Sequence, residues 1–207
     1  MSDTEATVFL IDDDHAVRDA LELLLESASF KTAAFENAQA FLDAYSQDSA
    51  GCLVLDIRMP DMSGMELQDA LVAKGITLPI IFLTGHGNVS MSAKAFRTGA
   101  VDFMEKPFDA SALLERIREA IQLDRTNRET TAKQENARAR LSTLTQREHQ
   151  VMLLVVAGKV NKEIAAELDL SHRTVEIHRG RVMEKTGTRS LTKLIELAIT
   201  SGFYQLD

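Results

Sequence analysis

Five polar residues in the first half of the sequence have types that suit phosphoryl chemistry. Asp12, Asp13, Asp56, Thr84 and Lys106 each come shortly after one of the apolar runs VFLI, CLVL, IIFL and VDFM. Clustered carboxylates repel one another unless a cation offsets the repulsion, and Mg²⁺ prefers oxygen ligands of this kind. Beside such a cation a carboxylate can attack phosphorus, while an ammonium and a hydroxyl hold the remaining phosphoryl oxygens. We therefore predict a magnesium and phosphoryl site in which a carboxylate such as Asp56 can act as the nucleophile.

These residues need a scaffold that brings the ends of several strands together. The first half alternates short apolar runs with amphipathic stretches, which is typical of a doubly wound, five-stranded parallel α/β sheet. In such a sheet, functional groups gather beyond the carboxyl ends of the strands. The predicted strands are 7–11, 31–35, 51–55, 79–83 and 101–104. The predicted helices are 15–28, 37–46, 64–74, 88–98 and a segment from Asp109.

The second half shows helical patterns only. Two short helices joined by a tight DLS turn are typical of a helix-turn-helix. We predict an all-α domain of four helices, which begin after a Thr145 cap, after an Asn161 cap, at Ser171 and at Ser190.

Charge is divided unevenly between the two halves. The net charge is −8, but residues 1–123 carry 20 Asp and Glu against 9 Lys and Arg, whereas residues 124–207 carry 11 against 14. An acidic surface repels nucleic acid, so contact with DNA belongs to the second half. We predict an α/β domain at 1–123, a polar helical linker at 124–140 and the all-α domain at 141–207. An acidic N-terminal segment and the lack of an apolar run of bilayer length favour a cytosolic protein with no membrane partner.

Four motifs, LIDDDHAVR, LVLDIRMPDMSGMEL, FLTGHG and AVDFMEKPF, resemble the receiver domain of two-component response regulators. The similarity covers residues 5–123 and implies a flavodoxin-like or CheY-like fold. It implies that Asp56 is the phosphoacceptor and that Asp13 binds Mg²⁺ directly. It also implies that Asp12 reaches the metal through water and that the backbone carbonyl of Arg58 is a further ligand.

The same resemblance implies roles around the phosphoryl group. The peptide bond between Lys106 and Pro107 is cis in the family, which positions the lysine ammonium. Thr84 and Phe103 match a switch pair in which the hydroxyl moves toward the phosphate and the aromatic ring turns inward. Gly85 leaves room beside the phosphoryl group.

Five further residues are candidates for tuning or transmitting the switch. Arg58 and His86 lie two positions after the nucleophile and the switch hydroxyl, where side chains admit or block hydrolytic water. Met91, Lys94 and Arg97 lie on the fourth predicted helix and are candidates for a surface that the switch remodels.

The third helix of the second half has two distinct faces. At 100° per residue, Val175 and Val182 share one side with Arg179 near them. The opposite side carries Arg173, Ile177, Gly180 and Glu184. An arginine, an aliphatic residue and a glycine on one face suit the major groove of DNA. Composition alone leaves a second interpretation open, a mildly basic and solvated helix of a small bundle.

Residues 144–198 resemble the LuxR-type helix-turn-helix, with LTQRE, NKEIA and SHRTVEIH as the most specific segments. The resemblance implies that Glu176, Ile177 and Gly180 meet bases, although Gly180 has no side chain to contribute. Residues implied to face phosphates are Thr174, His178, Arg181 and Lys185, and Arg173 can do either. The final helix has an apolar face that serves either a dimer or the core.

A receiver followed by a LuxR-type domain resembles the FixJ/NarL class of transcriptional regulators. This resemblance implies an activator that binds DNA when Asp56 is phosphorylated, with Mg²⁺ as cofactor. The expected partners are a sensor histidine kinase, a double-stranded DNA operator, a second copy of the chain on phosphorylation or on DNA, and RNA polymerase. No enzymatic turnover is expected beyond self-phosphorylation from a phosphodonor and slow autodephosphorylation.

Two other functions fit parts of this pattern. Aspartyl-phosphate hydrolases use a similar strand-end aspartate, but they need a second aspartate two residues later, where this chain has Arg58. A receiver that is only a scaffold, active without phosphate, has no reason to maintain clustered charge at Asp12, Asp13 and Asp56.

Overall fold

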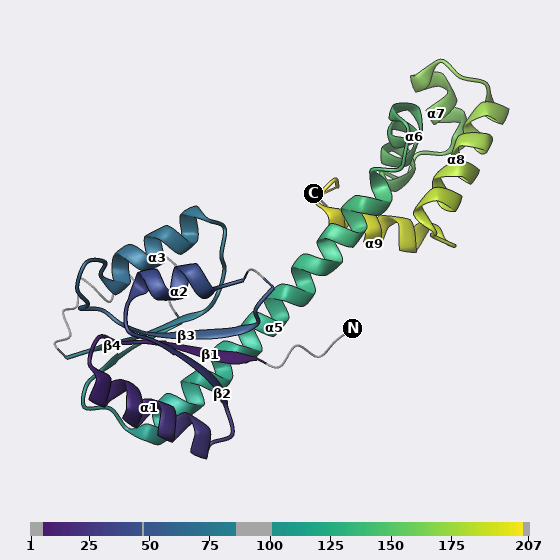
Figure 1. Cartoon of the computed structure of the whole chain (residues 1–207). Helices are drawn as coiled ribbons and strands as arrows, with labels where there is room; N and C mark the ends of the chain where they lie inside the picture. Colours follow the sequence, from purple (N-terminus) through teal and green to yellow (C-terminus); the bar gives the residue numbers. More distant parts are fainter. Residues whose placement is uncertain (1–5, 47, 86–100, 205–207) are drawn as a thin grey trace. The chain divides into compact units, whose positions relative to one another are not determined.

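The computed structural model describes residues 6–46, 48–85 and 101–204, which fall into two compact units, 1–127 and 128–207. The first unit contains a parallel sheet with strand order β2-β1-β3-β4-β5 (Figure 1). Its strands are β1 (Thr7–Ile11), β2 (Lys31–Phe35), β3 (Gly51–Asp56), β4 (Ile80–Thr84) and β5 (Asp102–Glu105). The doubly wound α/β sheet is confirmed, with β3 one residue longer than predicted and β4 and β5 displaced by one residue.

Helices cover both faces of this sheet, because successive strand residues point to opposite sides. Phe9 and Ile11 pack with α2 (Ala38–Ala44) and α3 (Gly64–Ala73), whereas Val8 and Leu10 pack with α1 (His15–Ser27) and the first turns of α5 (Ala110–Leu141). The predicted helix 88–98 lies outside the described residues, as do His86, Met91, Lys94 and Arg97.

Helix starts in this unit are fixed by polar caps. The Asp14 side chain accepts from the backbone N–H of Ala16 and so caps α1, a role the sequence analysis did not give it. Ser63 and Glu66 form a capping box at the start of α3. These caps fix where the two helices begin after the strand ends that carry Asp12 and Asp56.

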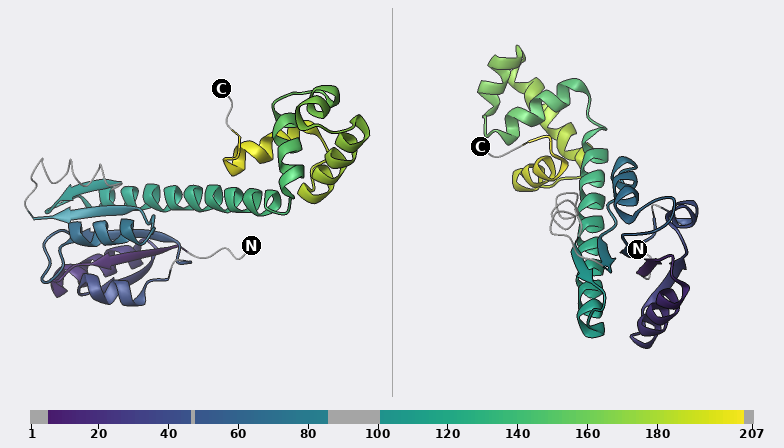
Figure 2. Two further views of the ribbon diagram at one scale, coloured as in Figure 1. Left: turned by 90° about the horizontal axis from the view of Figure 1, so that it is seen from above. Right: turned by 90° about the vertical axis from the view of Figure 1, so that its left-hand side faces the viewer.

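The second unit consists of the end of α5 and four helices, α6 (Gln146–Val156), α7 (Asn161–Leu168), α8 (His172–Thr186) and α9 (Leu191–Ser201). These helices, green to yellow in Figure 2, pack around one core. The four-helix prediction is confirmed, but the prediction that Asn161 caps α7 is wrong. Val160 is the cap residue, its N–H bonds the Glu163 carboxylate, and the Asn161 side chain accepts from Arg179 instead.

The described part of the chain contains no helix with both the length and the apolar character needed to cross a bilayer.

Candidate functional site

At the carboxyl edge of the sheet, two aspartate side chains contact the ammonium group of one lysine. Nζ of Lys106 lies 2.6 Å from Oδ2 of Asp12 and 2.8 Å from Oδ1 of Asp56. Both carboxyl groups are buried, with Asp12 only 1% and Asp56 only 7% exposed. The lysine therefore supplies the positive charge that allows two buried carboxylates to lie close together.

Burial and hydrogen bonding act against each other in this cluster. Desolvation raises the pKa of Asp12 above its usual value, although the hydrogen bond from Lys106 opposes the rise. Burial by itself would lower the pKa of Lys106, but its hydrogen bonds to Asp12 and Asp56 outweigh burial and raise it. The lysine consequently stays protonated as the counter-ion of the pocket at neutral pH.

Backbone groups hold the carboxylates in place. The N–H of Asp14 donates to Oδ1 of Asp12 at 3.0 Å, and the N–H of Arg58 donates to Oδ2 of Asp56 at 2.6 Å. Arg18 of α1 donates from Nη1 to the backbone oxygen of Asp12 at 2.7 Å. This positioning role of Arg18 was not predicted from the sequence. The position of Arg18, one turn into the helix that follows the DDD segment, is the signal that could have suggested it.

The start of α3 comes close to the nucleophile candidate. A Cβ on Gly64 would lie 2.4 Å from the backbone oxygen of Asp56, and the Gly64 N–H donates to the oxygen of Ile57 at 3.0 Å. Glycine is therefore required where the chain turns back from the end of β3 into α3. The sequence analysis also missed Gly64, for which the only signal is the glycine of the DMSGME segment.

The third carboxylate, Asp13, is exposed. Within the described ranges, no three acidic, histidine or cysteine side chains are grouped closely enough to hold a metal ion. The donor chemistry still suits Mg²⁺, because two buried carboxylates converge on one point and a third lies beside them in the sequence. The site thus brings together Asp12 and Asp56, with Lys106 between them, and leaves Asp13 at the surface.

The switch candidates line the adjacent strand ends. Thr84 is buried, and its backbone oxygen accepts from the Lys106 N–H at 2.6 Å. The Lys106–Pro107 peptide bond is cis, as the resemblance implies. The Phe103 ring is half-buried against Phe82, with 6.3 Å between the ring centroids.

Gly85 follows Thr84 and lies beside the Arg58 side chain, because a Cβ there would be 3.5 Å from Nη2 of Arg58. A larger residue at this position would meet the arginine, so Gly85 and Arg58 share the rim of the pocket.

In the second unit, α8 presents one free face. Val175 and Val182 are buried in the core, as expected of the inner face. The exposed residues on the other side include Arg173, Glu176, Ile177, Gly180, Arg181 and Glu184. Ile177 is an aliphatic side chain on this face and is 49% exposed.

Other candidates on α8 make contacts within the domain. Thr174 and His178 are half-buried, and the Thr174 hydroxyl shares a hydrogen bond of 2.7 Å with Ser171, the cap of the helix. Lys185 lies 2.6 Å from the Glu148 carboxylate and so joins the end of α8 to the start of α6. Lys185 is therefore already paired in this structure, whereas Arg173 and Arg181 extend from the exposed face.

Glu148 is a buried carboxylate held by several donors. Its side chain is 3% exposed, and it accepts from Lys185 at 2.6 Å and from the Thr145 N–H at 2.8 Å. The Lys185 hydrogen bond, followed by the backbone bond from Thr145, lowers the pKa of Glu148 to about 2. The charged pair locks α8 to the core at its last turn.

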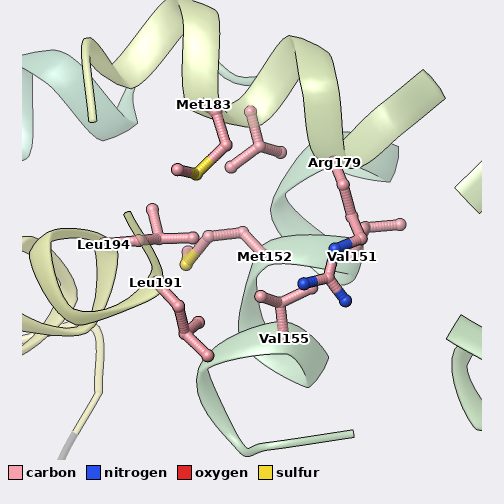
Figure 3. Close-up of a pocket in the computed structure, with 8 residues that line it drawn as sticks. Val151, Met152, Val155, Arg179, Met183, Leu191 and Leu194 are labelled. Carbon is pink, nitrogen blue, oxygen red and sulfur yellow. The ribbon is translucent and has the colours of Figure 1, made fainter. Parts of the chain in front are cut away.

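Behind the inner face of α8 lies a small apolar pocket of about 110 Å³ between α6, α8 and α9. Figure 3 shows Met152 and Leu194 pointing into it, with Arg179 along one wall. Nη1 of Arg179 donates to the Asn161 side chain of α7 at 2.8 Å. The pocket belongs to the packing of the domain and lies on the side of α8 away from its exposed face.

A parallel doubly wound sheet with a buried aspartate pair and lysine at its carboxyl edge defines a receiver-like unit, and α7 with α8 defines a helix-turn-helix unit. Residues 8–118 match the family described as "Response regulator receiver domain". Residues 142–198 match "Bacterial regulatory proteins, luxR family". Both families are regulatory, which disfavours the hydrolase alternative.

Whole-chain relatives agree with this assignment. The transcriptional regulatory protein FixJ of Bradyrhizobium diazoefficiens is 43% identical over 96% of this chain and 97% of its own length. The solved structure of the response regulator StyR is 42% identical, with a TM-score of 0.84 over 94% of this chain and 98% of StyR. Full-length FixJ from B. japonicum gives 42% identity and a TM-score of 0.59 over 98% of this chain and all of that chain. The chain belongs to the two-component response regulators that join a receiver domain to a LuxR-type DNA-binding domain.

Proposed function

We propose that a sensor histidine kinase transfers a phosphoryl group to Asp56 and that this switches DNA binding by the second unit. The observation that carries the proposal is the buried Asp12–Lys106–Asp56 cluster at the carboxyl edge of the sheet. An oxygen of Asp56 forms the new bond to phosphorus while the donor's leaving group departs. The only catalytic events in this proposal are acceptance and slow hydrolysis of that phosphoryl group.

Mg²⁺ is the proposed cofactor, with Asp12, Asp13, Asp56 and the backbone carbonyl of Arg58 as its protein ligands. When bound, the metal offsets the charge of the carboxylates and of the phosphoryl oxygens. Lys106 then exchanges a carboxylate partner for a phosphoryl oxygen.

The Thr84 hydroxyl and Phe103 form the proposed switch, and Gly85 leaves space for the phosphoryl group. The hydroxyl donates to a phosphoryl oxygen, and the half-buried Phe103 ring turns further inward beside Phe82.

The proposed organisation is a receiver at 1–123, a helical linker at 124–140 and a DNA-binding domain at 141–207. Phosphorylation changes the receiver surface and favours a homodimer that matches two half-sites on an operator. In this proposal the protein is located in the cytosol, contacts RNA polymerase and activates transcription.

We further propose that α8 lies in the major groove. Its exposed face suits this role because it combines two arginines, two acidic residues, an aliphatic side chain and a glycine. The proposed base contacts are Glu176, Ile177 and Gly180, with Arg173 at bases or phosphates. The proposed phosphate contacts are Thr174, His178, Arg181 and Lys185.

The phosphoacceptor is tested by intact mass after incubation with Mg²⁺ and acetyl phosphate. The wild type is expected to gain one phosphoryl group and Asp56→Asn none. Asp61→Asn is the matched control, because Asp61 is an exposed acidic residue five positions later and should label normally. If Asp56→Asn gains a phosphoryl group, the acceptor is a different residue. The same conclusion follows if Asp61→Asn is the one variant that fails to gain it.

The DNA contacts are tested with a duplex selected from a random-sequence pool by the phosphorylated protein. Arg173→Ala is expected to weaken binding by roughly 1–3 kcal/mol, because it removes a side chain at the base edges or phosphates. Lys193→Ala, on α9, removes an exposed cation of the same unit and should change affinity little. Equal losses in the two variants would mean that α8 has no special role in binding.

A further inference from the structure

The end of α5 is tied to the helix-turn-helix unit by two arginines that lie two positions apart. Nε of Arg140 donates to the backbone oxygen of Thr186 at 2.8 Å, and Nη2 of Arg140 bonds the same oxygen. Nε of Arg138 donates to the backbone oxygen of Ser201 at 3.0 Å. Thr186 is the last residue of α8 and Ser201 is the last residue of α9. Each arginine therefore serves as a cap for the C-terminus of a different helix.

These bonds satisfy carbonyl groups that would otherwise lack a partner. The last carbonyls of a helix have no intrahelical donor, and a cation there is also favoured by the helix dipole. Thr186 is fully buried, so water cannot easily replace a lost donor. Two other carbonyls at this end have backbone partners, since the Gly187 N–H donates to Glu184 and the Thr188 N–H donates to Met183.

The apolar side of α5 anchors the two arginines. Ala137 and Leu141 are four residues apart, lie on one face of the helix and are buried in the core of the second unit. Both arginines precede residue 142, where the match to the luxR family begins. The last turn of α5 is thus part of the folded helix-turn-helix unit.

We propose that Arg140 is a positioning residue for DNA recognition, acting through the Thr186 carbonyl to fix the C-terminal end of α8. This rests on the proposed function, in which α8 reads DNA. At its first turn α8 is fixed by the Ser171 cap, and at its middle by the bond from Arg179 to Asn161. At its last turn the Lys185–Glu148 pair holds a side chain, whereas Arg140 holds the last carbonyl of the helix. Loss of the Arg140 bonds would therefore loosen the helix end at Thr186 and shift its exposed face.

The test uses the full chain with Mg²⁺ and acetyl phosphate, and compares Arg140→Met with Arg138→Met. Each variant removes the donors to one helix end while keeping most of the side-chain stem. The readout is the ratio of affinities for a duplex selected by the wild type and for its scrambled sequence. Arg140→Met is expected to lower this ratio roughly tenfold, about 1.4 kcal/mol, whereas Arg138→Met should leave it unchanged.

Two further measurements separate positioning from other roles. The dependence of binding on salt should keep its slope in Arg140→Met, because a direct phosphate contact would change that slope by about one unit. Amide hydrogen exchange at Thr188 should accelerate in the same variant, since this N–H closes the end of α8. If Arg140→Met fails to fold, Arg140→Lys carries the test, because the lysine ammonium offers one donor in place of two and an intermediate ratio is expected.

Three results would overturn the proposal. An unchanged ratio in Arg140→Met with faster exchange at Thr188 would show that the end of α8 does not affect recognition. An equal fall in Arg138→Met would show a general loss of stability, and a changed salt slope would show direct contact with DNA. If Arg173→Ala binds the selected duplex as the wild type does, the premise that α8 reads DNA is wrong, whatever Arg140 does.

Discussion

Replacing Glu148 with glutamine tests how strongly a single buried charge holds α8 to the core. The Glu148 carboxylate is 3% exposed and joins Lys185 of α8 to the first turn of α6. A glutamine oxygen can still accept from the Thr145 N–H, so the substitution removes mainly the charge that faces Lys185. The change therefore isolates the ion pair from the helix cap.

The magnitude follows from the pKa of Glu148, which falls from 4.5 to about 2 in the folded chain. A shift of this size corresponds to about 3 kcal/mol, because each unit is about 1.4 kcal/mol. Lys185 is 35% exposed, so solvent screens the pair and we expect a loss of about 2 kcal/mol. Since the folded pKa is lowered, the contribution is present above pH 4.5 and disappears as the pH falls toward 2.

The assay is urea unfolding of the full chain, monitored through the NMR resonances of α6 and α8. These resonances report on the second unit separately. The difference between wild type and Glu148→Gln should be constant near neutral pH and smaller at about pH 3. Glu196→Gln is the matched control, because its pair with Lys193 at 2.7 Å is more than half exposed and should contribute under about 0.5 kcal/mol. Equal effects of the two substitutions, or a difference that does not depend on pH, would refute this account.

Three other substitutions probe the pocket and the exposed face of α8. Gly64→Ala places a Cβ 2.4 Å from the backbone oxygen of Asp56 and should lower the stability of the first unit in urea unfolding by about 1–3 kcal/mol. An unchanged stability would mean that α3 can shift to make room for the methyl group. Gly180→Ala meets open space in a helix and should stabilise the second unit by about 0.5–1 kcal/mol, with a loss contradicting its exposed position. Lys106→Met should cost about 2–3 kcal/mol in Mg²⁺-free urea unfolding, because two buried carboxylates lose their counter-ion. Added Mg²⁺ should restore part of this stability, and an equal gain in the wild type would argue against a shared site.

The fold of the first unit could be predicted because each of its strands is a short apolar run between amphipathic segments. Val8 to Ile11 carry no polar alternation, which is expected of a strand buried on both faces, and the two clusters of the core confirm it. Strand ends were misplaced by single residues, because hydrogen bonding at the ends depends on the neighbouring strand. Asp56, for example, is the last residue of β3 and pairs with Leu83.

The residues of the pocket could be predicted from their positions, but their partners could not. Repulsion among three aspartates predicted a cation, and the structure places the ammonium of Lys106 between two of them, from 94 and 50 residues away. The Asn161 side chain was expected to cap α7, yet it bonds Arg179 of α8 instead. Local capping rules could not reveal this competition, because the competing donor lies on another helix.

Contacts over long sequence distances also explain why the bonds made by the end of α5 could not be predicted. The segment NRETTAKQENARAR is polar, and nothing in its pattern distinguishes arginines that bind helix ends from arginines that face water. Ala137 is too small to signal a core position on its own, and the helix ends that Arg138 and Arg140 bind lie 63 and 46 residues further along the chain. A charged helix can therefore be part of a domain through its polar side chains. For this reason a DNA-binding fragment cut just before residue 142 would lack the arginine donors to the last carbonyls of both α8 and α9.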